Sequence, residues 1–448
     1  METGLRDMKF NKRKIIDDFR AMIRLKTISS ADLQKMDMKE FAAFRQLLLD
    51  RFQAIRANAE IREIPPTGIL FRIRGASQDA PSVLMAHYDV VPVNQEGWTC
   101  DPFGAEIRDG RIYGRGTLDT KGTLCSIMEA VDHALAQGWV PKNDLYLSFG
   151  GEEEVSGETT WNIVDVLAKE GVAPAFVLDE GGAVIPEGLP GLKKKSAMVG
   201  IAEKGTANYM LTVRAKGGHA STPPRHTAIG KLAKAAVRLE ENPFPARLSS
   251  PVKLMFREIA KEVPFYERPA FANAELLEPA IKTAATVLGS SFNAMVRTTT
   301  AVVIFEGRSA FNVLPDRAAM GVNVRMLEGD TPESICEELK KKVKDPDVEV
   351  DLIAGTPPTP VSEIDCPEWE MLKRTIRRVW KDVPVGPYQL NGGTDSRYYS
   401  EISNHVYKFT PMEMTAEERS TVHGANESVR IENLLKTVIF YSVLLEEL

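Results

Sequence analysis

Three consecutive glutamates, Glu152, Glu153 and Glu154, stand between a run of β-prone residues and a glycine. Carboxylates crowded together repel one another, and the repulsion grows as water is excluded. A bound metal ion is the simplest partner that would relieve this repulsion. A solvated acidic loop is the alternative for an isolated run of this kind, so the rest of the chain has to decide between the two.

Other side chains able to bind a metal follow predicted strands. His87 comes directly after the β-prone run Ser82–Ala86, and Asp179 directly after Phe176–Leu178. Asp89 lies two residues beyond His87, on the same side of an extended chain, where it could support the imidazole ring. Because ligands gather where the carboxyl ends of parallel strands meet, we expect these side chains at one edge of a sheet.

Asp119 and His423 complete the set of candidate ligands. Asp119 lies between a glycine-rich turn and the predicted helix Leu124–Ala136, so capping of that helix is its alternative role. Two imidazoles and three carboxylates without cysteine suit zinc, with cobalt or manganese as substitutes. Two metal ions about 4 Å apart, bridged by a carboxylate, would need such a set. The candidate ligands are His87, Asp119, Glu154, Asp179 and His423, with Glu153 beside them.

The elements that would position these residues alternate between strands and helices. Two amphipathic helices are predicted within Lys12–Ala57, followed by strands at Gly68–Arg74 and Leu145–Phe149 and a helix at Ile163–Lys169. This alternation is typical of an α/β fold with a largely parallel, mixed sheet flanked by helices. The helix Arg430–Leu445 closes the chain.

From about Thr206 the character of the sequence changes. Two predicted helices, a small mixed sheet and a helical insertion over Asn242–Val296 indicate a separate α+β domain. The proline-rich run Gly355–Pro360 is interpreted as the linker back. We therefore expect a catalytic domain in two segments, 1–205 and 356–448, with an inserted domain at 206–355.

The composition is that of an ordinary globular protein: 448 residues, of which 43% are hydrophobic and 26% are charged. The net charge of -6, without a long basic stripe, argues against a nucleic-acid partner. The four cysteines are scattered and predict neither a disulfide framework nor a thiolate zinc site. No apolar run approaches the roughly 20 residues that span a bilayer. Met1–Phe10 lacks the apolar core of a signal peptide, so the expected location is the cytoplasm, with no membrane partner.

In its combined motifs the sequence resembles the di-zinc co-catalytic peptidases that include glutamate carboxypeptidase, aminoacylase and carnosinase, and most closely their Gly-X carboxypeptidase (carboxypeptidase S) branch. The resemblance spans nearly the whole chain in order. It rests on His87–Pro92, Gly114–Gly122, Glu153–Glu154, Leu178–Gly181, Gly218–Ser221, Asn312–Pro315, Gly392–Arg397 and His423–Glu427.

This resemblance implies a zinc-exopeptidase-like fold that binds two Zn²⁺ ions per subunit. The implied roles are His87 and Asp179 on one zinc, Glu154 and His423 on the other, Asp119 bridging both, Glu153 as general base and acid, and Asp89 behind His87. Water between two such metals has its pKa lowered from 15.7 to near 7, so a neighbouring glutamate can take its proton.

The resemblance also implies that the inserted domain serves as a lid and a dimerisation domain. Its histidine, His219, would stabilise the tetrahedral intermediate, in many relatives across a homodimer. Asn312 and Arg325 would bind the carbonyl and the carboxylate of the substrate, since the planar fork of arginine suits a carboxylate. A surface ion pair is the alternative role for Arg325. The loop Gly392, Gly393 and Thr394 would let the backbone approach the ligand.

One departure concerns the acidic run. The family usually has Asp-Glu-Glu-x-Gly-Gly, whereas this chain has Glu152-Glu153-Glu154-Val155-Ser156-Gly157. Glu152 and Glu153 could therefore act as base and ligand in a shifted register, although Val155 and Gly157 favour Glu153 and Glu154. Ser156 replaces a glycine and restricts the backbone there.

The expected function is zinc-dependent hydrolysis of an amide bond that releases a C-terminal amino acid from a dipeptide or short peptide. An N-acyl-amino-acid deacylase is the nearest alternative. A catalytically inactive binding protein on the same fold is a third possibility, of a different class.

Overall fold

The computed structural model describes residues 10–448 except 189–193, 267, 274, 288–289 and 308–309. The segment Met1–Phe10, in which no signal peptide is predicted, therefore lies almost wholly outside the described residues. The described chain forms two compact units. Unit 1 comprises residues 1–201, 362–387 and 394–448, and unit 2 comprises residues 202–361 and 388–393.

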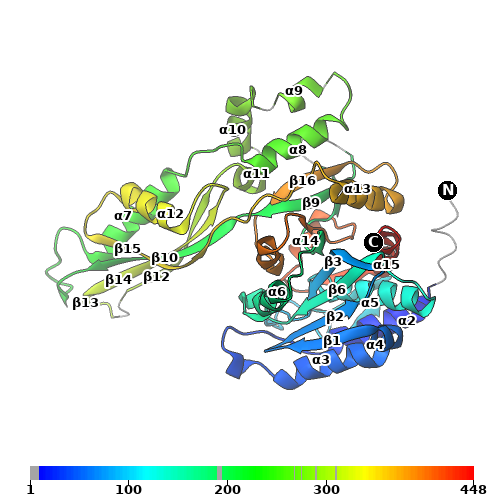
Figure 1. Cartoon of the computed structure of the whole chain (residues 1–448). Helices are drawn as coiled ribbons and strands as arrows, with labels where there is room; N and C mark the ends of the chain where they lie inside the picture. Colours follow the sequence, from blue (N-terminus) through cyan, green and yellow to red (C-terminus); the bar gives the residue numbers. More distant parts are fainter. Residues whose placement is uncertain (1–9, 189–193, 267, 274, 288–289, 308–309) are drawn as a thin grey trace. The chain divides into compact units, whose positions relative to one another are not determined.

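Unit 1 is built on a sheet whose strands follow the order β1-β2-β6-β3-β7-β17-β9-β16, with β8 paired to β9 (Figure 1). The strands are β1 Ala59–Ile64, β2 Gly68–Ile73, β3 Ser77–His87, β6 Asn143–Gly150, β7 Phe176–Asp179, β8 Val184–Ile185, β9 Ser196–Glu203, β16 Val385–Leu390 and β17 Val406–Lys408. The last residues of β9 and β16 belong to unit 2. β6, β3, β7 and β17 run parallel, whereas β1, β2 and β9 join the sheet antiparallel. The predicted α/β fold with a mixed, largely parallel sheet is confirmed.

Helices cover both faces of this sheet. On one face, alternate strand residues such as Val83, Tyr146 and Val177 are buried in one cluster with Ile163 and Leu167 of α6. α5 contacts β3 and in turn packs against α2, α4 and α15. The apolar residues of α5 recur on several sides, which agrees with a helix buried between layers. The helices of this unit are α2 Lys12–Arg24, α3 Met38–Arg51, α4 Gln53–Asn58, α5 Lys121–Ala136, α6 Thr159–Lys169, α13 Pro367–Val379, α14 Ala416–Ser420 and α15 Ile431–Leu445.

Short elements complete unit 1. β5 (Arg111–Tyr113) lies between β4 (Glu106–Arg108) and β18 (Ser428–Arg430) in a small sheet. Single turns of 3-10 helix occur at η1 (Leu33–Lys35) and η2 (Glu153–Val155), and a longer one at η3 (Asp395–Glu401). η2 contains two of the three consecutive glutamates.

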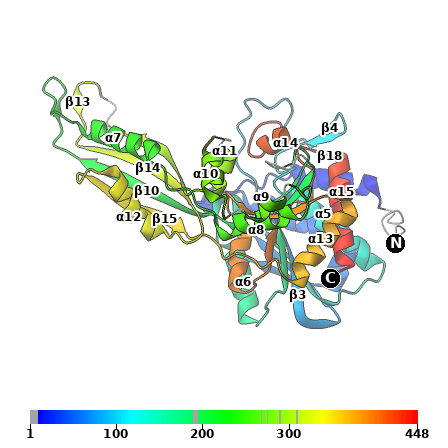
Figure 2. The ribbon, with the colours of Figure 1, turned by 90° about the horizontal axis from the view of Figure 1, so that it is seen from above.

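Unit 2 has a four-stranded sheet in the order β12-β14-β10-β15 (Figure 1). The three strand pairs are all antiparallel, so the expectation of a mixed sheet was wrong. α7 and α12 lie side by side on one face, where Leu232 and Leu339 are buried with strand residues such as Leu211 (Figures 1 and 2). The elements are β10 Gly205–Arg214, β11 Gly218–His219, α7 Ala228–Glu241, β12 Thr299–Glu306, β13 Val313–Leu314, β14 Arg317–Met326, α12 Pro332–Val343 and β15 Val348–Thr356.

Within its described residues, the predicted helical insertion of unit 2 contains four helices, α8 Ser250–Ala260, α9 Arg268–Ala272, α10 Glu278–Val287 and α11 Ser290–Met295. In the part of the chain that the structure describes, no helix combines the length and the apolar character needed to cross a membrane.

Candidate active site

The carboxyl ends of β6, β3 and β7 bring several predicted ligands to one edge of the sheet of unit 1. His87 is the last residue of β3 and pairs with Gly150 at the end of β6. Asp179 is the last residue of β7, the other parallel neighbour of β3. The glutamates of η2 follow β6 after two residues. The parallel arrangement thus gathers residues that are far apart in sequence.

Asp119 lies between two imidazole rings. Its Oδ1 is 2.9 Å from Nε2 of His87, and its Oδ2 is 3.0 Å from Nε2 of His423. Nε2 of His423 is also 2.9 Å from Oε2 of Glu154. Asp119 is not the cap of α5, because Thr120 occupies that position without a capping hydrogen bond from its side chain. One carboxylate therefore presents an oxygen to each of two groups of ligand-type side chains.

The first of these groups contains Glu180 in the position that the sequence assigned to Asp179. Oε1 of Glu180 lies 3.2 Å from Nε2 of His87, and the ligand atoms of His87, Asp119 and Glu180 lie within 4.8 Å of one another. The buried Asp179 carboxylate instead accepts a hydrogen bond of 3.2 Å from the backbone N–H of Ser396. Glu180, one residue beyond the ligand that the resemblance implies, is therefore the member of this group that the structure places beside His87 and Asp119.

The second group consists of Asp119, Glu154 and His423, whose ligand atoms also lie within 4.8 Å of one another. Glu153 belongs to neither group, and its Oε2 is 3.9 Å from Nε2 of His87. The geometry therefore fits the register in which Glu154 is a ligand and Glu153 is left beside the ligands.

Asp89 holds both His87 and the glutamate turn. Its Oδ1 lies 3.2 Å from Nδ1 of His87, and its two oxygens accept hydrogen bonds from the backbone N–H groups of Glu153 (3.2 Å) and Glu154 (3.1 Å). Asp89 is completely buried. A single carboxylate therefore orients one imidazole and fixes the backbone from which the two glutamates project.

Glu152 has a different surrounding from its two neighbours. Its buried carboxylate accepts hydrogen bonds from the hydroxyl groups of Thr159 and, at 3.4 Å, Thr67. Burial raises the pKa of Glu152. Glu152 thus joins the turn to the start of α6 and to the residue preceding β2, away from both groups of ligands.

The loops that carry Asp119 and His423 are tied together by a buried ion pair that the sequence reasoning did not assign. The Arg115 guanidinium lies 2.6 Å from the Glu427 carboxylate and donates to the carbonyl oxygens of His423 and Gly424, each at 3.0 Å. Glu427 also accepts from the backbone N–H of Asp119 at 3.3 Å. Both residues lie within motifs quoted above, but local sequence gives no sign that they pair.

The electrostatics of the cluster favour a cation. Burial, and then the Asp119 charge, raises the pKa of Glu180 to about 8, and burial raises the pKa of Glu153 well above its usual value. Hydrogen bonds with Asp119 and Glu154 raise the pKa of His423 to about 10. A bound divalent cation would favour the ionised form of these carboxylates and the deprotonated form of the two imidazoles. The donor set of imidazoles and carboxylates fits zinc.

Unit 2 holds His219 and Asn312 next to each other. β11 pairs with β13 so that His219 faces Val313, and the N–H of Ala220 donates to the carbonyl oxygen of Asn312 at 3.1 Å. Both residues line a cavity of about 450 Å³. Nδ1 of His219 accepts from the backbone N–H of Ser221 at 3.2 Å. Because that N–H can only donate, the neutral ring carries its proton on Nε2 and presents it as a donor.

The remaining predicted substrate residues fall in both units. Arg325 lies on β14, opposite Thr206 and Thr299, and its charge contributes to the lowered pKa of the buried Lys204, after burial itself. Gly392 and Gly393 belong to unit 2, whereas Thr394 belongs to unit 1. The Thr394 hydroxyl accepts a hydrogen bond from Ser396 and caps η3.

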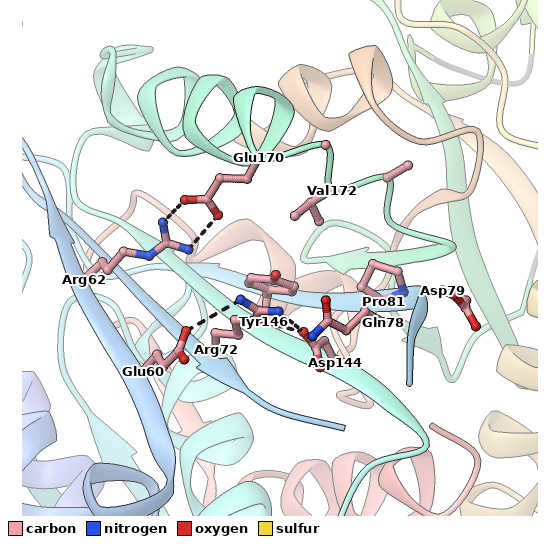
Figure 3. Close-up of a pocket in the computed structure, with 12 residues that line it drawn as sticks. Glu60, Arg62, Arg72, Gln78, Asp79, Pro81, Asp144, Tyr146, Glu170 and Val172 are labelled. Carbon is pink, nitrogen blue, oxygen red and sulfur yellow. Dashed lines mark hydrogen bonds and ion pairs between the residues drawn. The ribbon is translucent and has the colours of Figure 1, made fainter. Parts of the chain in front are cut away.

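A larger cavity at the opposite end of the sheet carries no comparable chemistry. It has a volume of about 570 Å³ and is lined by charged residues from the beginning of β6 and from β1 and β2 (Figure 3). Arg62 is paired with Glu170, and Arg72 is 2.6 Å from Asp144 (Figure 3). The two guanidinium groups of the lining are thus both paired with carboxylates, of which the lining carries four.

The fold and the two groups that share Asp119 indicate a class: a metal-dependent hydrolase with an α/β fold. Comparison with known proteins agrees. The model of Peptidase family M20/M25/M40 matches residues 83–447. The chain belongs to this family and is a hydrolase that acts on amide bonds. The resemblance inferred from the motifs is thereby confirmed.

Similar proteins include two enzymes and one solved structure. The chain is 34% identical over 443 residues to the N-fatty-acyl-amino acid synthase/hydrolase PM20D1 of Xenopus tropicalis, covering 97% of this chain and 86% of that protein. It is 34% identical over 426 residues to a probable carboxypeptidase S-like 2 of Dictyostelium discoideum, covering 93% and 81% of the two chains. The M20 family metallo-carboxypeptidase Sso-CP2 of Sulfolobus solfataricus shares the fold, with a TM-score of 0.69, 18% identity, and coverage of 98% and 99%.

Proposed function

We propose that this protein hydrolyses an amide bond with two zinc ions per chain and releases an amino acid that keeps its free carboxylate. The observation that carries the proposal is the Asp119 carboxylate, whose two oxygens lie 2.9 Å from His87 and 3.0 Å from His423. The proposed ligands are His87, Asp119 and Glu180 for one ion, and Asp119, Glu154 and His423 for the other. Cobalt or manganese could substitute.

Glu153 is the proposed general base and acid. Two zinc ions at the groups around Asp119 would lower the pKa of water to about 7 and polarise the carbonyl of the amide. Glu153 lies beside the ligands without belonging to either group, and burial already raises its pKa, so its carboxylate is suited to accept a proton and return it to the leaving nitrogen. Asp89 keeps Glu153 in place through its backbone N–H.

We propose that the substrate is an N-acyl amino acid, and a dipeptide is the second candidate. Both classes share an amide bond next to a free carboxylate, so the metal groups do not separate them. The Xenopus relative is described as an N-fatty-acyl-amino acid synthase/hydrolase and is similar over 97% of this chain, which favours the acyl class. The carboxypeptidase S-like relative keeps a peptide as the second candidate.

A paired substrate assay tests this proposal. The zinc-loaded enzyme is given an N-fatty-acyl amino acid, an N-acetyl amino acid and a dipeptide with the same C-terminal residue, and release of the free amino acid is measured. We expect the fatty-acyl substrate to have the highest kcat/KM. Higher kcat/KM for the dipeptide would move the assignment to a dipeptidase, and hydrolysis of none of the three would reject the proposal.

In unit 2 we propose that His219 donates from Nε2 to the developing oxyanion, and that Asn312 and Arg325 bind the substrate carbonyl and carboxylate. The Ser221 N–H at Nδ1 supports this donor tautomer of His219. The backbone of Gly392, Gly393 and Thr394 is proposed to approach the ligand. An Arg325→Lys variant tests the carboxylate role: KM should rise for acyl amino acids, and a substrate amidated at its carboxyl group should be unaffected. An equal loss on both substrates would contradict it.

We further propose a homodimer formed through unit 2. β12 is an edge strand of its sheet, and Val303, Ile304 and Phe305 are exposed on it to 60%, 43% and 45%. A hydrophobic edge strand of this kind pairs readily with another chain. Light scattering should give twice the chain mass for the wild type and the chain mass for Val303→Lys. A monomeric wild type would contradict the proposal.

A further inference from the structure

A third group of side chains of the types that bind metals lies at the other end of the sheet of unit 1. The Cys366 thiol, the Glu368 carboxylate and the His405 imidazole offer ligand atoms within 4.8 Å of one another. Cys366 is the residue immediately before α13, and His405 immediately precedes β17. β17 runs parallel to β7, so this group lies at the amino ends of the strands, whereas His87 and Asp179 lie at the carboxyl ends of β3 and β7.

The hydrogen bonding of His405 points to a ligand. Its Nδ1 is 2.9 Å from the carbonyl oxygen of Ala175, which can only accept, so Nδ1 carries a proton. In the neutral ring Nε2 then presents a lone pair, and this atom lies 3.8 Å from Oε2 of Glu363. Both atoms are acceptors, so a cation bound between them would join Nε2 to the Glu363 carboxylate, while Oε2 of Glu368 lies 3.9 Å from Nδ1. A histidine whose second nitrogen donates to a carbonyl is the usual arrangement at a metal site.

The Cys366 thiol is available for the same ion. It is half-buried, forms no disulfide, and lies 3.2 Å from the hydroxyl group of Tyr407. Tyr407 in turn donates to the carbonyl oxygen of Glu363 at 2.6 Å. This hydrogen bond holds the backbone three residues before Cys366. His405 also lines an open cavity of about 560 Å³, through which an ion from solvent can reach the ring.

We propose that Cys366, Glu368 and His405 bind a single zinc-type ion, with Glu363 as the nearest candidate for a fourth ligand. A thiolate combined with imidazole and carboxylate suits zinc, and it excludes calcium and magnesium, which require oxygen ligands. The ion would join the start of α13 to the start of β17 and stabilise this end of the sheet. It is a third metal, distinct from the pair around Asp119, and it does not depend on the proposed reaction.

Cobalt substitution tests this site because its Cys366 thiolate distinguishes it from the groups around Asp119. The groups around Asp119 contain no cysteine, so a thiolate-to-cobalt charge-transfer band in the near ultraviolet reports on the Cys366 site alone. The full-length protein is stripped of metal and titrated with cobalt. We expect the band in the wild type, its loss in Cys366→Ser, and its retention in Cys100→Ser, a matched control at a partly exposed cysteine outside the group. Zinc bound per chain should fall by one in Cys366→Ser.

A second measurement guards against a serine variant that fails to fold. Zinc should slow the modification of Cys366 by a thiol reagent in the wild type, and a chelator should restore the rate. His405→Asn leaves the thiol intact and should abolish the protection. The absence of a charge-transfer band, a band that survives in Cys366→Ser, or a modification rate that is independent of zinc would each overturn the proposal.

Discussion

Two neighbouring carboxylates at the end of β7 point to different places. Glu180 lies 3.2 Å from His87, whereas Asp179 accepts from the backbone of Ser396. Adjacent residues of an extended strand project to opposite sides, so a shift of one residue decides which carboxylate reaches the metal groups. Metal affinity should therefore depend on Glu180 as a ligand and on Asp179 only as a support for the loop before η3.

The first prediction follows from this difference. Glu180→Gln should lose one of the two metal ions of the site, because a neutral amide is a weaker ligand than a carboxylate. Asp179→Asn should keep both ions, because an amide oxygen can still accept the Ser396 hydrogen bond. Metal content after dialysis, measured by elemental analysis, distinguishes the variants. Loss of metal from Asp179→Asn with retention in Glu180→Gln would restore the sequence-based assignment.

Sequence reasoning found most of the residues that the structure gathers at the site. His87, Asp119, Glu154 and His423 lie together, and Asp89 stands behind His87 as expected. The ion pair of Arg115 and Glu427 was not found, because its partners are 312 positions apart in the sequence and nothing local couples them. The resemblance implied Asp179 as the ligand, and the local sequence gives no sign that Glu180 lies 3.2 Å from His87.

At the scale of elements, the turn that contains η2 depends on Gly157, the second residue after η2. Ser156 has a positive φ of 53°, so the serine that replaces the usual glycine occupies a backbone conformation that favours glycine. The next residue, Gly157, has no room for a side chain, because an added Cβ would lie 2.4 Å from Cβ of Glu152. The turn therefore tolerates a side chain at position 156 and excludes one at position 157.

The second prediction compares these two positions. Gly157→Ala should destabilise the protein by about 1–3 kcal/mol, because the Glu152 side chain has to move from its contacts with Thr67 and Thr159. Ser156→Gly, the matched control, should change the free energy of unfolding by at most about 1 kcal/mol, since relief of strain offsets the added freedom of the unfolded chain. Urea unfolding measures both. Equal stability of Gly157→Ala and the wild type would show that Glu152 is not held as described.

The contact between α2 and α5 includes a buried carboxylate with an altered pKa. Glu129 on α5 lies 3.0 Å from Nζ of Lys14, which is also 2.9 Å from Asp18. Burial raises the pKa of Glu129 to about 7 although Lys14 lowers it, and the neighbouring Asp18 adds a smaller upward effect. The folded protein therefore binds a proton at this position more tightly than the unfolded chain does.

The third prediction is the resulting pH dependence. The contribution of Glu129 to stability is fully present below about pH 4.5, where the carboxyl group of the unfolded chain is protonated, and is lost as the pH rises to about 7. The stability of the wild type relative to Glu129→Gln should fall by up to about 3 kcal/mol across this window. Unfolding curves of the two proteins at several pH values provide the test. A difference that grows with pH would mean that Lys14 keeps Glu129 ionised.

The sequence identified β3 and β6 from their apolar runs, which are buried. β1, β9 and β16 were not predicted. β1 is only partly buried, so it lacks a continuous apolar run, and β16 contains a proline. The antiparallel arrangement of the unit 2 sheet also could not be derived, since strand direction depends on how distant segments pair.

At the scale of the whole molecule, the family match over residues 83–447 covers both units, and the proposed catalytic and binding residues are divided between them. Unit 1 supplies every member of the two groups around Asp119, and unit 2 supplies His219 and Asn312. Residues 388–393 belong to unit 2 although the chain on both sides of them belongs to unit 1. Local composition gives no sign of this crossing.

The most direct test of the account concerns Glu153, which is proposed to move protons and not to bind metal. The measurement is the metal content and kcat of the full-length Glu153→Gln variant, with Glu152→Gln as the control for a change of charge in the same turn. We predict that Glu153→Gln binds two metal ions, as the wild type does, while kcat falls by about 10²–10⁴-fold. Glu152→Gln should keep the metals and most of the activity. Loss of metal from Glu153→Gln, or turnover close to that of the wild type, would contradict the account.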